Sequence, residues 1–428
     1  MNIRQKSVAL LAFACAAALL PAQDLTQYTT FTVGGRTIQI HGFASQGYAL
    51  SYNNNYLTMD TTKGAFNMTD AGVNVSTQLT DKFRVGAQVY VRDIGKLGQW
   101  HPQLDWAYAD YRFKQWFGVR GGKVKTVMGL FNDTQDNDSL HTFALLPQSV
   151  YPTDLRDGTI GHTGADLYGN VEVKHLGSFD YTVYAGHRQD TQYGGYSLMV
   201  QSRGIDMTSY HGPQWGADLK WTTPVKGLLL GGSGLRENVS GEGTTVCNQK
   251  VASVNCAVWT ADTGGKYWEK SKQAWSNFLY GEYTLGNLRV DSEYRRSYRN
   301  QEVWSGLWSV WADTRGYYPS AAYRFSKRFE LGSYYSRFTC TWVSGGLGPH
   351  GPTVKPPSLD TSLPGNHIYD KVVTARFDLT RAWNVKVEGH FMDGYGTNQS
   401  PDGFYATDNP LGFKPKTNLV LVRTGWSF

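Results

Sequence analysis

The C-terminal stretch from Asn418 to Phe428 most constrains what this chain can fold into. One parity of the stretch is apolar and ends in aromatic side chains: Val420, Val422, Thr424, Trp426 and Phe428. Because successive side chains of a β-strand point to opposite faces, the pattern predicts a strand with one apolar face. An apolar face with aromatic residues at its end is typical of a strand that closes a β-barrel in a membrane. Such a strand must pair with the first strand, and the rest of the chain should then show the same alternation.

The alternation does recur along the chain. It is clearest from Phe83 to Arg92, where valines alternate with polar or charged side chains. We count about sixteen such segments, joined by roughly seven short turns and eight longer loops. The first runs from Arg36 to about Tyr48. An even number of strands with both termini on the short-turn side predicts an all-β fold, a transmembrane antiparallel β-barrel of about 16 strands.

Composition supports this fold class over the alternatives. The chain is rich in Tyr (27), Trp (14) and Gly (48), yet its mean hydropathy is -0.42. After the N-terminus no stretch approaches the roughly 18 consecutive apolar residues of a membrane-spanning helix. A large soluble sandwich or propeller is disfavoured by the alternation of short and long connections and by aromatic residues at the ends of apolar faces, such as Trp106, Tyr108 and Trp215. The net charge of +6 is too small and too evenly spread to predict binding of nucleic acid.

Residues 1–22 have the pattern of a secretory signal peptide. Arg4 and Lys6 give a basic start, an apolar run follows from Val8 to Leu20, and a cleavage site follows Ala22. Cys15 raises a lipoprotein alternative, which the bulky residues before it disfavour. We therefore expect a short N-terminal segment at residues 23–35, one barrel at residues 36–428, and an outer-membrane location.

Three cysteines lie beyond the signal peptide. Cys247 and Cys256 lie close together in a polar segment, where they could form a small disulfide or be two unrelated surface thiols. Cys340 interrupts a strand pattern and is expected to be a packed thiol. We expect no metal site and no cofactor.

Charged side chains opposite the apolar parity are candidates for the wall of the channel. The basic ones are Arg84, Arg92, Lys123, Lys125, Arg289, Arg295 and Arg376. Acidic residues share these faces. The wall could therefore be an ordinary solvated surface of mixed charge, or a basic arc that faces acidic groups across a constriction and sorts ions.

A long insertion at residues 129–158 is the candidate constriction loop. Its charged residues are Asp133, Asp136, Asp138, Asp154, Arg156 and Asp157. It also carries Phe143, Leu145 and Val150, which an exposed loop does not need. We therefore expect the loop to fold inward and pack inside the barrel, or to pack against a neighbouring subunit. The spacing of its aspartates departs from a calcium-binding loop and lacks the closing Glu.

Part of the chain resembles the porins of Gram-negative outer membranes. The resemblance covers about fifty residues from Arg120 to Gly169, including Leu146-Pro-Gln-Ser-Val-Tyr-Pro-Thr-Asp-Leu-Arg156-Asp157. The terminal Trp426-Ser-Phe428 is similar to the assembly signal of these porins. The resemblance implies a sixteen-stranded homotrimeric diffusion channel whose third extracellular loop folds inward. It also implies contact with outer-membrane lipid and lipopolysaccharide, and recognition of the Phe428 strand by the barrel assembly machinery.

The sequence thus predicts a porin through which small hydrophilic solutes and ions diffuse passively. The alternatives are a channel selective for an anion or metabolite, and a structural or adhesive barrel whose lumen is blocked by its loops. An enzyme is not expected: His162 and His390 are present, but no G-x-S-x-G motif supplies a nucleophile. A receptor with a plug domain needs about twenty-two strands, more than this chain can supply.

Overall fold

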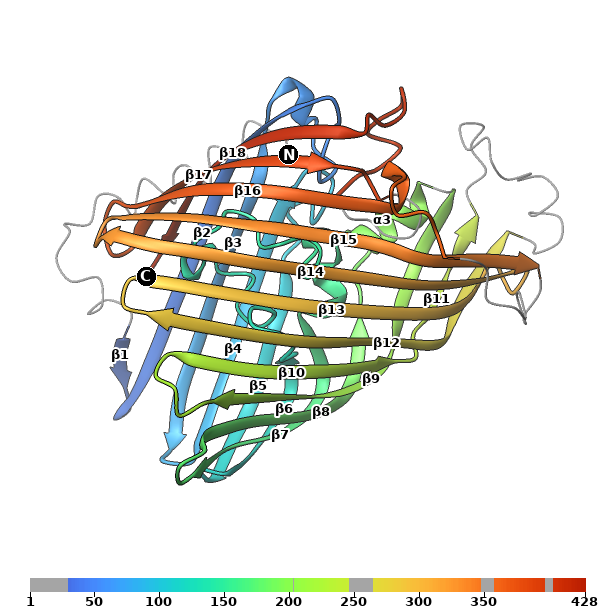
Figure 1. Ribbon diagram of the computed structural model, residues 1–428. Coiled ribbons are helices and arrows are strands. Elements are labelled where there is room, and N and C mark those ends of the chain that lie inside the picture. The colour runs from blue at the N-terminus through green and yellow to red at the C-terminus, as the bar shows by residue number, and fades with distance from the viewer. Residues whose placement is uncertain (1–29, 203, 246–264, 348–357, 397–402) are drawn as a thin grey trace.

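The computed structural model describes residues 30–202, 204–245, 265–347, 358–396 and 403–428. Its strands join into one antiparallel sheet that closes into a barrel of 16 strands, which confirms the predicted fold class (Figure 1). The sheet has 18 labelled strands because β1 lies outside the barrel and β10 and β11 together form one barrel strand. Both β10 and β11 pair with β9 on one side and β12 on the other.

The strands follow one another around the barrel in chain order. They are β1 (Thr30–Val33), β2 (Arg36–Tyr52), β3 (Ala65–Thr80), β4 (Phe83–Ile94), β5 (Gln103–Lys114), β6 (Phe117–Lys125), β7 (Gly161–Val173), β8 (Gly177–Gln189), β9 (Ile205–Thr222), β10 (Leu228–Glu237), β11 (Ser240–Thr245), β12 (Lys266–Leu285), β13 (Leu288–Val303), β14 (Trp308–Ser326), β15 (Phe329–Leu347), β16 (His367–Asp378), β17 (Trp383–Asp393) and β18 (Lys416–Ser427). The helices are short: α2 (Arg156–Thr159), α3 (Gly195–Gln201) and the 3-10 turns η2 (Thr61–Lys63), η3 (Asp138–Leu140), η4 (Thr153–Leu155) and η5 (Pro364–Asn366). In the described part of the chain, no helix has the length and hydropathy needed to cross a membrane.

The C-terminal strand closes the barrel, as its sequence predicts. Strand β18 pairs with β2 from Asn418↔Tyr52 to Ser427↔Phe43. The terminal residue extends this seam, because Phe428 and Gly42 exchange two backbone hydrogen bonds of 3.0 and 3.2 Å. Closure leaves no barrel strand with an unpaired edge, which a membrane requires.

In this barrel apolar side chains are exposed and charged side chains are buried, the reverse of a soluble protein. On β18, Val420 is 50% exposed whereas Arg423 is 7% exposed. The exposed faces of the strands are apolar, while the buried polar residues face the lumen. This is the arrangement that a lipid exterior and an aqueous interior favour.

Aromatic side chains gather where the strands meet the short turns. Contacting pairs there include Phe83–Tyr111, Phe179–Trp221, Phe325–Phe329 and Trp426–Phe428. Such a girdle is typical of the interface between lipid and water.

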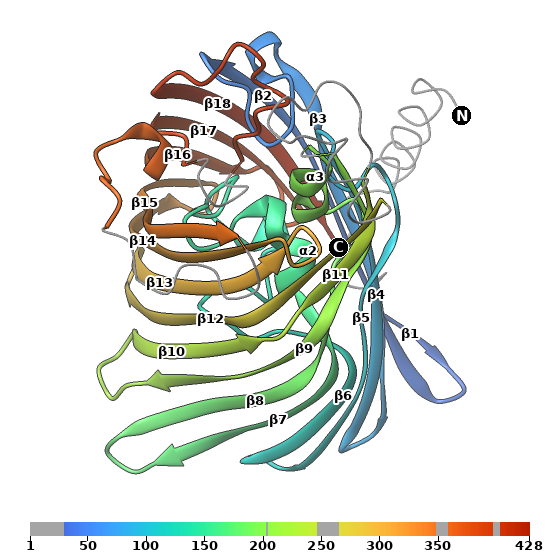
Figure 2. The ribbon, with the colours of Figure 1, turned by 90° about the vertical axis from the view of Figure 1, so that its right-hand side faces the viewer.

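Strand β1 was not predicted. It forms a hairpin with the start of β2, from Thr30↔Gln39 to Val33↔Arg36, and projects away from the barrel (Figure 2). The hairpin therefore occupies part of the predicted N-terminal segment. Residues 1–29, with the signal peptide and Cys15, lie outside the described residues, as do Cys247 and Cys256. Cys340 is buried on β15.

Candidate functional site

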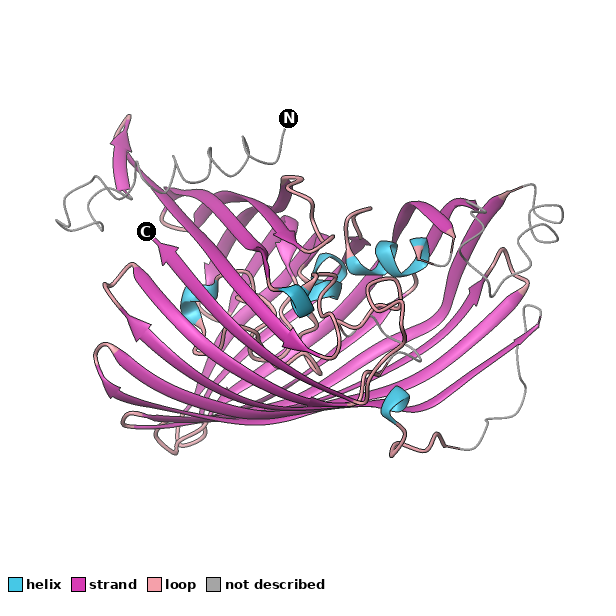
Figure 3. Cartoon of the chain, turned by 90° about the horizontal axis from the view of Figure 1, so that it is seen from above, coloured by secondary structure: helices cyan, strands magenta, loops and turns pink. Residues whose placement is uncertain are grey.

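Residues 126–160, here called the pore segment, join β6 to β7 and contact strands on both sides of the barrel. The two ends of the segment start from one point, because Lys125 and Gly161 are paired residues of neighbouring strands. At the far side, Ser149 contacts Ser336 of β15, with 2.8 Å between their hydroxyl oxygens. In the order of the barrel strands, β15 lies opposite β6. Figure 3 shows the loops and helical turns between opposite walls of strands.

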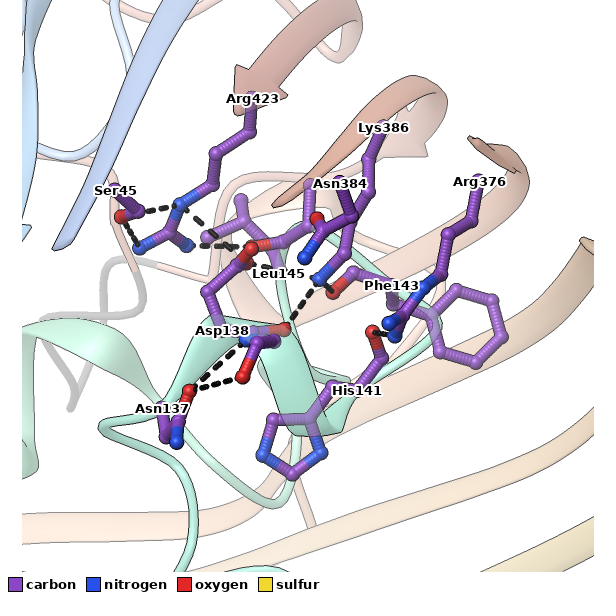
Figure 4. Close-up of polar contacts among 12 residues, drawn as sticks. Ser45, Asn137, Asp138, His141, Phe143, Leu145, Arg376, Asn384, Lys386 and Arg423 are labelled. Carbon is purple, nitrogen blue, oxygen red and sulfur yellow. Dashed lines mark hydrogen bonds and ion pairs between the residues drawn. The ribbon is translucent and has the colours of Figure 1, made fainter. Parts of the chain in front are cut away.

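Basic side chains of the wall hold the pore segment by its backbone. Six of them, from six strands, donate hydrogen bonds to its carbonyl oxygens: Lys125 to Asp133 (2.7 Å), Lys386 to Asp138 (2.6 Å), Arg376 to His141 (2.7 Å), Arg423 to Ala144 (2.7 Å), Arg295 to Val150 (3.0 Å) and Arg92 to Thr153 (2.8 Å). Figure 4 shows three of these cations around residues 137–145. Charged donors make stronger hydrogen bonds than neutral ones.

Two buried carboxylates hold the backbone N–H groups of the same segment. Glu388 of β17 accepts from the amides of Ala144 (2.8 Å) and Leu145 (3.0 Å). Glu293 of β13 accepts from the amide of Leu130 (3.0 Å) and from the hydroxyl of Tyr151 (2.6 Å). The far wall, formed by β13 to β18, thus binds the backbone of the pore segment with both basic and acidic side chains.

The acidic residues Asp136 and Asp138 are paired with cations of the wall. Asp136 binds Lys125 at 2.7 Å and accepts from Gln88 at 2.6 Å, while Asp138 binds Lys386 at 3.0 Å. Burial by itself would raise the pKa of both carboxyls, but their cationic neighbours more than offset it and the pKa of each is lowered. Both residues are therefore ionised at neutral pH.

Arg156 and Asp157 attach the other end of the pore segment to β4 and β5. Arg156 binds Asp105 at 2.8 Å, and its guanidinium lies 3.8 Å from the centre of the Tyr90 ring. Asp157 binds Arg92 at 2.8 Å. Burial opposes the ionised form of Asp157, yet Arg92 and a hydrogen bond from Thr191 leave its pKa lowered.

Asp154 is different, because no cation lies within ion-pair distance of its carboxyl group in the described structure. It accepts from the amide of Gly403 and the hydroxyl of Tyr405, each at 3.0 Å. These contacts join the pore segment to the connection between β17 and β18. Burial raises the pKa of Asp154 to about 7 because the two hydrogen bonds offset it only in part.

The remaining predicted residues occupy varied positions. Arg289 donates to Thr142 at 3.1 Å, Arg84 donates to Ser76 at 2.8 Å, and Asp133 lines a cavity beside the pore segment. The prediction for Lys123 was wrong. Its paired neighbours are Ala107 and Thr163, so it lies on the outward face of the barrel and not on the pore wall. Lys125 lies two residues further along β6, on the same parity as Lys123. However, it is the last residue of the strand, where the chain turns into the lumen, and its side chain lines the cavity.

Two aromatic residues also differ from the expectation that they end an apolar outward face. Trp106 pairs with Gln88, whose side chain is buried, and Tyr108 lines the same cavity as Gln88. Both therefore face the lumen. A register shift next to Val89 places Asp105 inward as well, and the sequence does not reveal such shifts. The anchoring roles of Lys386, Glu388 and Glu293 were also missed, although all three fall on the polar parity of their strands.

Two cavities border the pore segment on opposite sides. The larger, of about 620 Å³, lies toward the short turns and is lined by parts of β2 to β6 and by residues 133–140. The smaller, of about 100 Å³, lies toward the long loops, and its lining includes Arg188, Arg295, Arg299 and Glu237. The lining of the larger cavity holds two cations and two anions, whereas cations outnumber anions in the lining of the smaller one.

Comparison with known proteins identifies the fold. No protein-family model and no curated sequence matches the chain. Among solved structures, it is similar to OmpF of Salmonella typhi (TM-score 0.53, 14% identity, 93% of this chain and 100% of that one). It is also similar to OmpT, an outer membrane protein of Vibrio cholerae (TM-score 0.52, 11% identity, 93% of this chain and 99% of that one). A third similar structure is an anion-selective porin from Comamonas acidovorans (TM-score 0.50, 10% identity, 92% of this chain and 100% of that one). The chain has the fold of outer-membrane porins.

Proposed function

We propose that this protein is a porin of the Gram-negative outer membrane that lets small hydrophilic solutes and ions diffuse passively. The observation that carries the proposal is a closed 16-stranded barrel with a polar lumen, in which the pore segment leaves a cavity of about 620 Å³. Sixteen strands enclose a lumen wide enough for water. The pore segment is the constriction, because it is held on both walls.

Single-channel conductance of the refolded mature protein in a planar bilayer tests this proposal. The comparison is a variant in which a short Gly-Ser turn replaces residues 126–160. This variant keeps the barrel closed because Lys125 and Gly161 are neighbours in the sheet. We expect conductance from the wild type and a several-fold larger conductance from the variant. Folded wild type without conductance, beside a conducting variant, would instead identify a barrel blocked by its own segment.

We also propose that the barrel assembles as a homotrimer. The outward face of β3 to β6 is hollowed by small residues, including Ala87, Ala107, Ala109 and Gly121, which line a groove of about 520 Å³. Small residues let membrane segments approach closely. Mass measurement of the detergent-extracted protein tests the assembly, with Ala109→Trp expected to give monomers. Unchanged trimers in that variant would place the interface elsewhere.

A further inference from the structure

The larger cavity has the features of a binding subsite and not only of an open passage. A row of side chains in register crosses four strands: His41 of β2, Asn74 of β3, Gln88 of β4 and Trp106 of β5. All four line the cavity. Asn74 donates to Gln88 at 3.2 Å, which fixes one amide against the next. The row therefore presents hydrogen-bonding groups beside an aromatic ring.

The Trp106 ring lies along the wall. A Cβ atom added at Gly86 of the neighbouring strand would lie 3.1 Å from Trp106 Cζ3, so the ring covers the glycine. The Trp106 ring stacks on the Tyr108 ring, with 5.1 Å between the ring centres and 26° between the ring planes. Trp106 is partly exposed and lines the cavity. Stacking on the wall gives the aromatic surface a fixed orientation.

Arg120 holds this aromatic surface from the next strand. Its guanidinium lies 5.2 Å from the ring centre of Tyr108 and 4.8 Å from that of Tyr168. Asp110 and Asp166 lie 3.6 and 3.8 Å from the same guanidinium. The charge of Arg120 is therefore balanced within the wall, and its contacts fix the ring of Tyr108.

The two cations that line the cavity are each paired with carboxylates of the described structure. The cations are Arg120 and Lys125, and the anions are Asp133 and Asp136. Lys125 and Asp136 form an ion pair of 2.7 Å. The smaller cavity is different, because three arginines and one glutamate line it. The larger cavity thus offers an anion no cation that lacks a carboxylate partner, while Asp133 can accept hydrogen bonds from hydroxyl groups, so a neutral hydroxylated ligand fits it.

We infer that the larger cavity is a subsite for an uncharged, hydroxylated ring of the size of a sugar. Trp106 and Tyr108 would contact the C–H face of the ring, while Asn74, Gln88 and the polar residues of segment 133–140 would bind its hydroxyl groups. The volume of about 620 Å³ lies within the range of small-molecule sites, roughly 300–1,000 Å³. The inference rests on the proposed function, because the solute reaches this site through the pore.

The test is block of single-channel current by glucose, a neutral ring, compared with sorbitol, an open chain with similar hydroxyl groups. We expect glucose to interrupt the current of the wild type at millimolar concentration, and sorbitol to do so roughly tenfold less well. Trp106→Ala should weaken the glucose block about tenfold, and Trp106→Phe should largely preserve it. The matched control is Trp215→Ala, since Trp215 is 49% exposed on the outward face of β9.

Equal block by glucose and sorbitol, or equal block in wild type and Trp106→Ala, would overturn the subsite while leaving the channel intact. If the wild type does not conduct, the proposed function fails and the subsite is tested separately. Equilibrium dialysis of radiolabelled glucose against the folded protein in detergent then decides it. Binding that Trp106→Ala weakens and Trp215→Ala leaves unchanged would support the subsite, and absence of binding would refute it.

Discussion

The two walls of the barrel hold the pore segment in different ways. On the near wall, formed by β4, β5 and β6, side chains of the segment form ion pairs with side chains of the barrel, as in Arg92–Asp157 and Arg156–Asp105. On the far wall, formed by β13 to β18, side chains of the barrel mostly bind the backbone of the segment, as Arg376 and Glu388 do.

This difference determines which sequence changes each wall tolerates. A backbone carbonyl or amide is present whatever the residue, so the far contacts depend mainly on the residues of the barrel. The ion pairs that distinguish the near wall need charged residues on both partners. We therefore expect the path of the segment across the lumen to depend on the far wall, and the charge of the pore to depend on the near wall.

The largest effect is expected from breaking the far wall at Lys386. Lys386→Met removes the donor to the carbonyls of Asp138 and Phe143 and leaves Asp138 with Arg423 as its remaining cation. Loss of one partner from a buried ion pair costs about 3–5 kcal/mol of unfolding free energy. Denaturant unfolding in detergent measures this cost. The control Lys386→Met/Asp138→Leu should recover part of it, and a single variant as stable as the wild type would contradict the anchoring role.

Asp154 provides a contact that belongs to neither wall and that depends on pH. Its pKa is raised in the folded protein from the ordinary 3.8 to about 7. A carboxyl with a raised pKa favours folding in its protonated form, so this contribution is complete below about pH 4 and is lost as pH rises to about 7. The loss amounts to roughly 4 kcal/mol at most.

We expect the current through the wild type to fluctuate more as pH rises from 5 to 8, because ionisation of Asp154 leaves a buried charge without a cation at ion-pair distance in the described structure and destabilises the packing of the pore segment there. Asp154→Asn cannot ionise and should remove this dependence. Single-channel recordings at several pH values measure it. A wild type and an Asp154→Asn variant with the same pH dependence would exclude Asp154 as its source.

An intermediate effect is expected at Glu293, the second carboxylate of the far wall. Glu293→Gln keeps the size of the side chain but replaces a carboxyl group that accepts three hydrogen bonds, from Tyr151, Tyr318 and Leu130, with an amide that has one acceptor oxygen. Weakening of this buried cluster should cost about 1–3 kcal/mol in unfolding free energy. The matched control is Glu282→Gln on β12, a partly exposed glutamate that accepts one long hydrogen bond of 3.4 Å from Thr284, and it should change stability by less than about 0.5 kcal/mol.

The smallest effect on stability, and the clearest on selectivity, is expected at the near wall. Asp136→Asn leaves Lys125 without its nearest carboxylate but keeps a group that can bind Gln88. The reversal potential under a KCl gradient should shift toward anions by about a factor of two in permeability ratio. A comparable shift in Arg376→Gln, on the far wall, would show that the two walls do not divide these roles.

Much of the barrel was predictable because alternation and turn chemistry are local. The parity of β18 predicted its apolar face, and closure against β2 follows from the cost of an unpaired edge in lipid. Parity also identified Arg92 and Arg376 as polar residues of the lumen, whereas Asp138 was identified from the long insertion that carries it. Parity misplaced Lys123, Trp106 and Tyr108, because a register shift or a change of direction at a strand end changes the face that a residue occupies.

The sequence by itself determined the architecture, since one apolar parity repeated along the chain leaves few folds in which every backbone group is paired. Only the tertiary structure decided which charges meet. Asp138 lies far along the chain from Lys386 and Arg423, and its pairing with them depends on the route of residues 126–160 across the lumen. Contacts between a loop and distant strands depend on the sum of many weak interactions, which no local pattern in the sequence records.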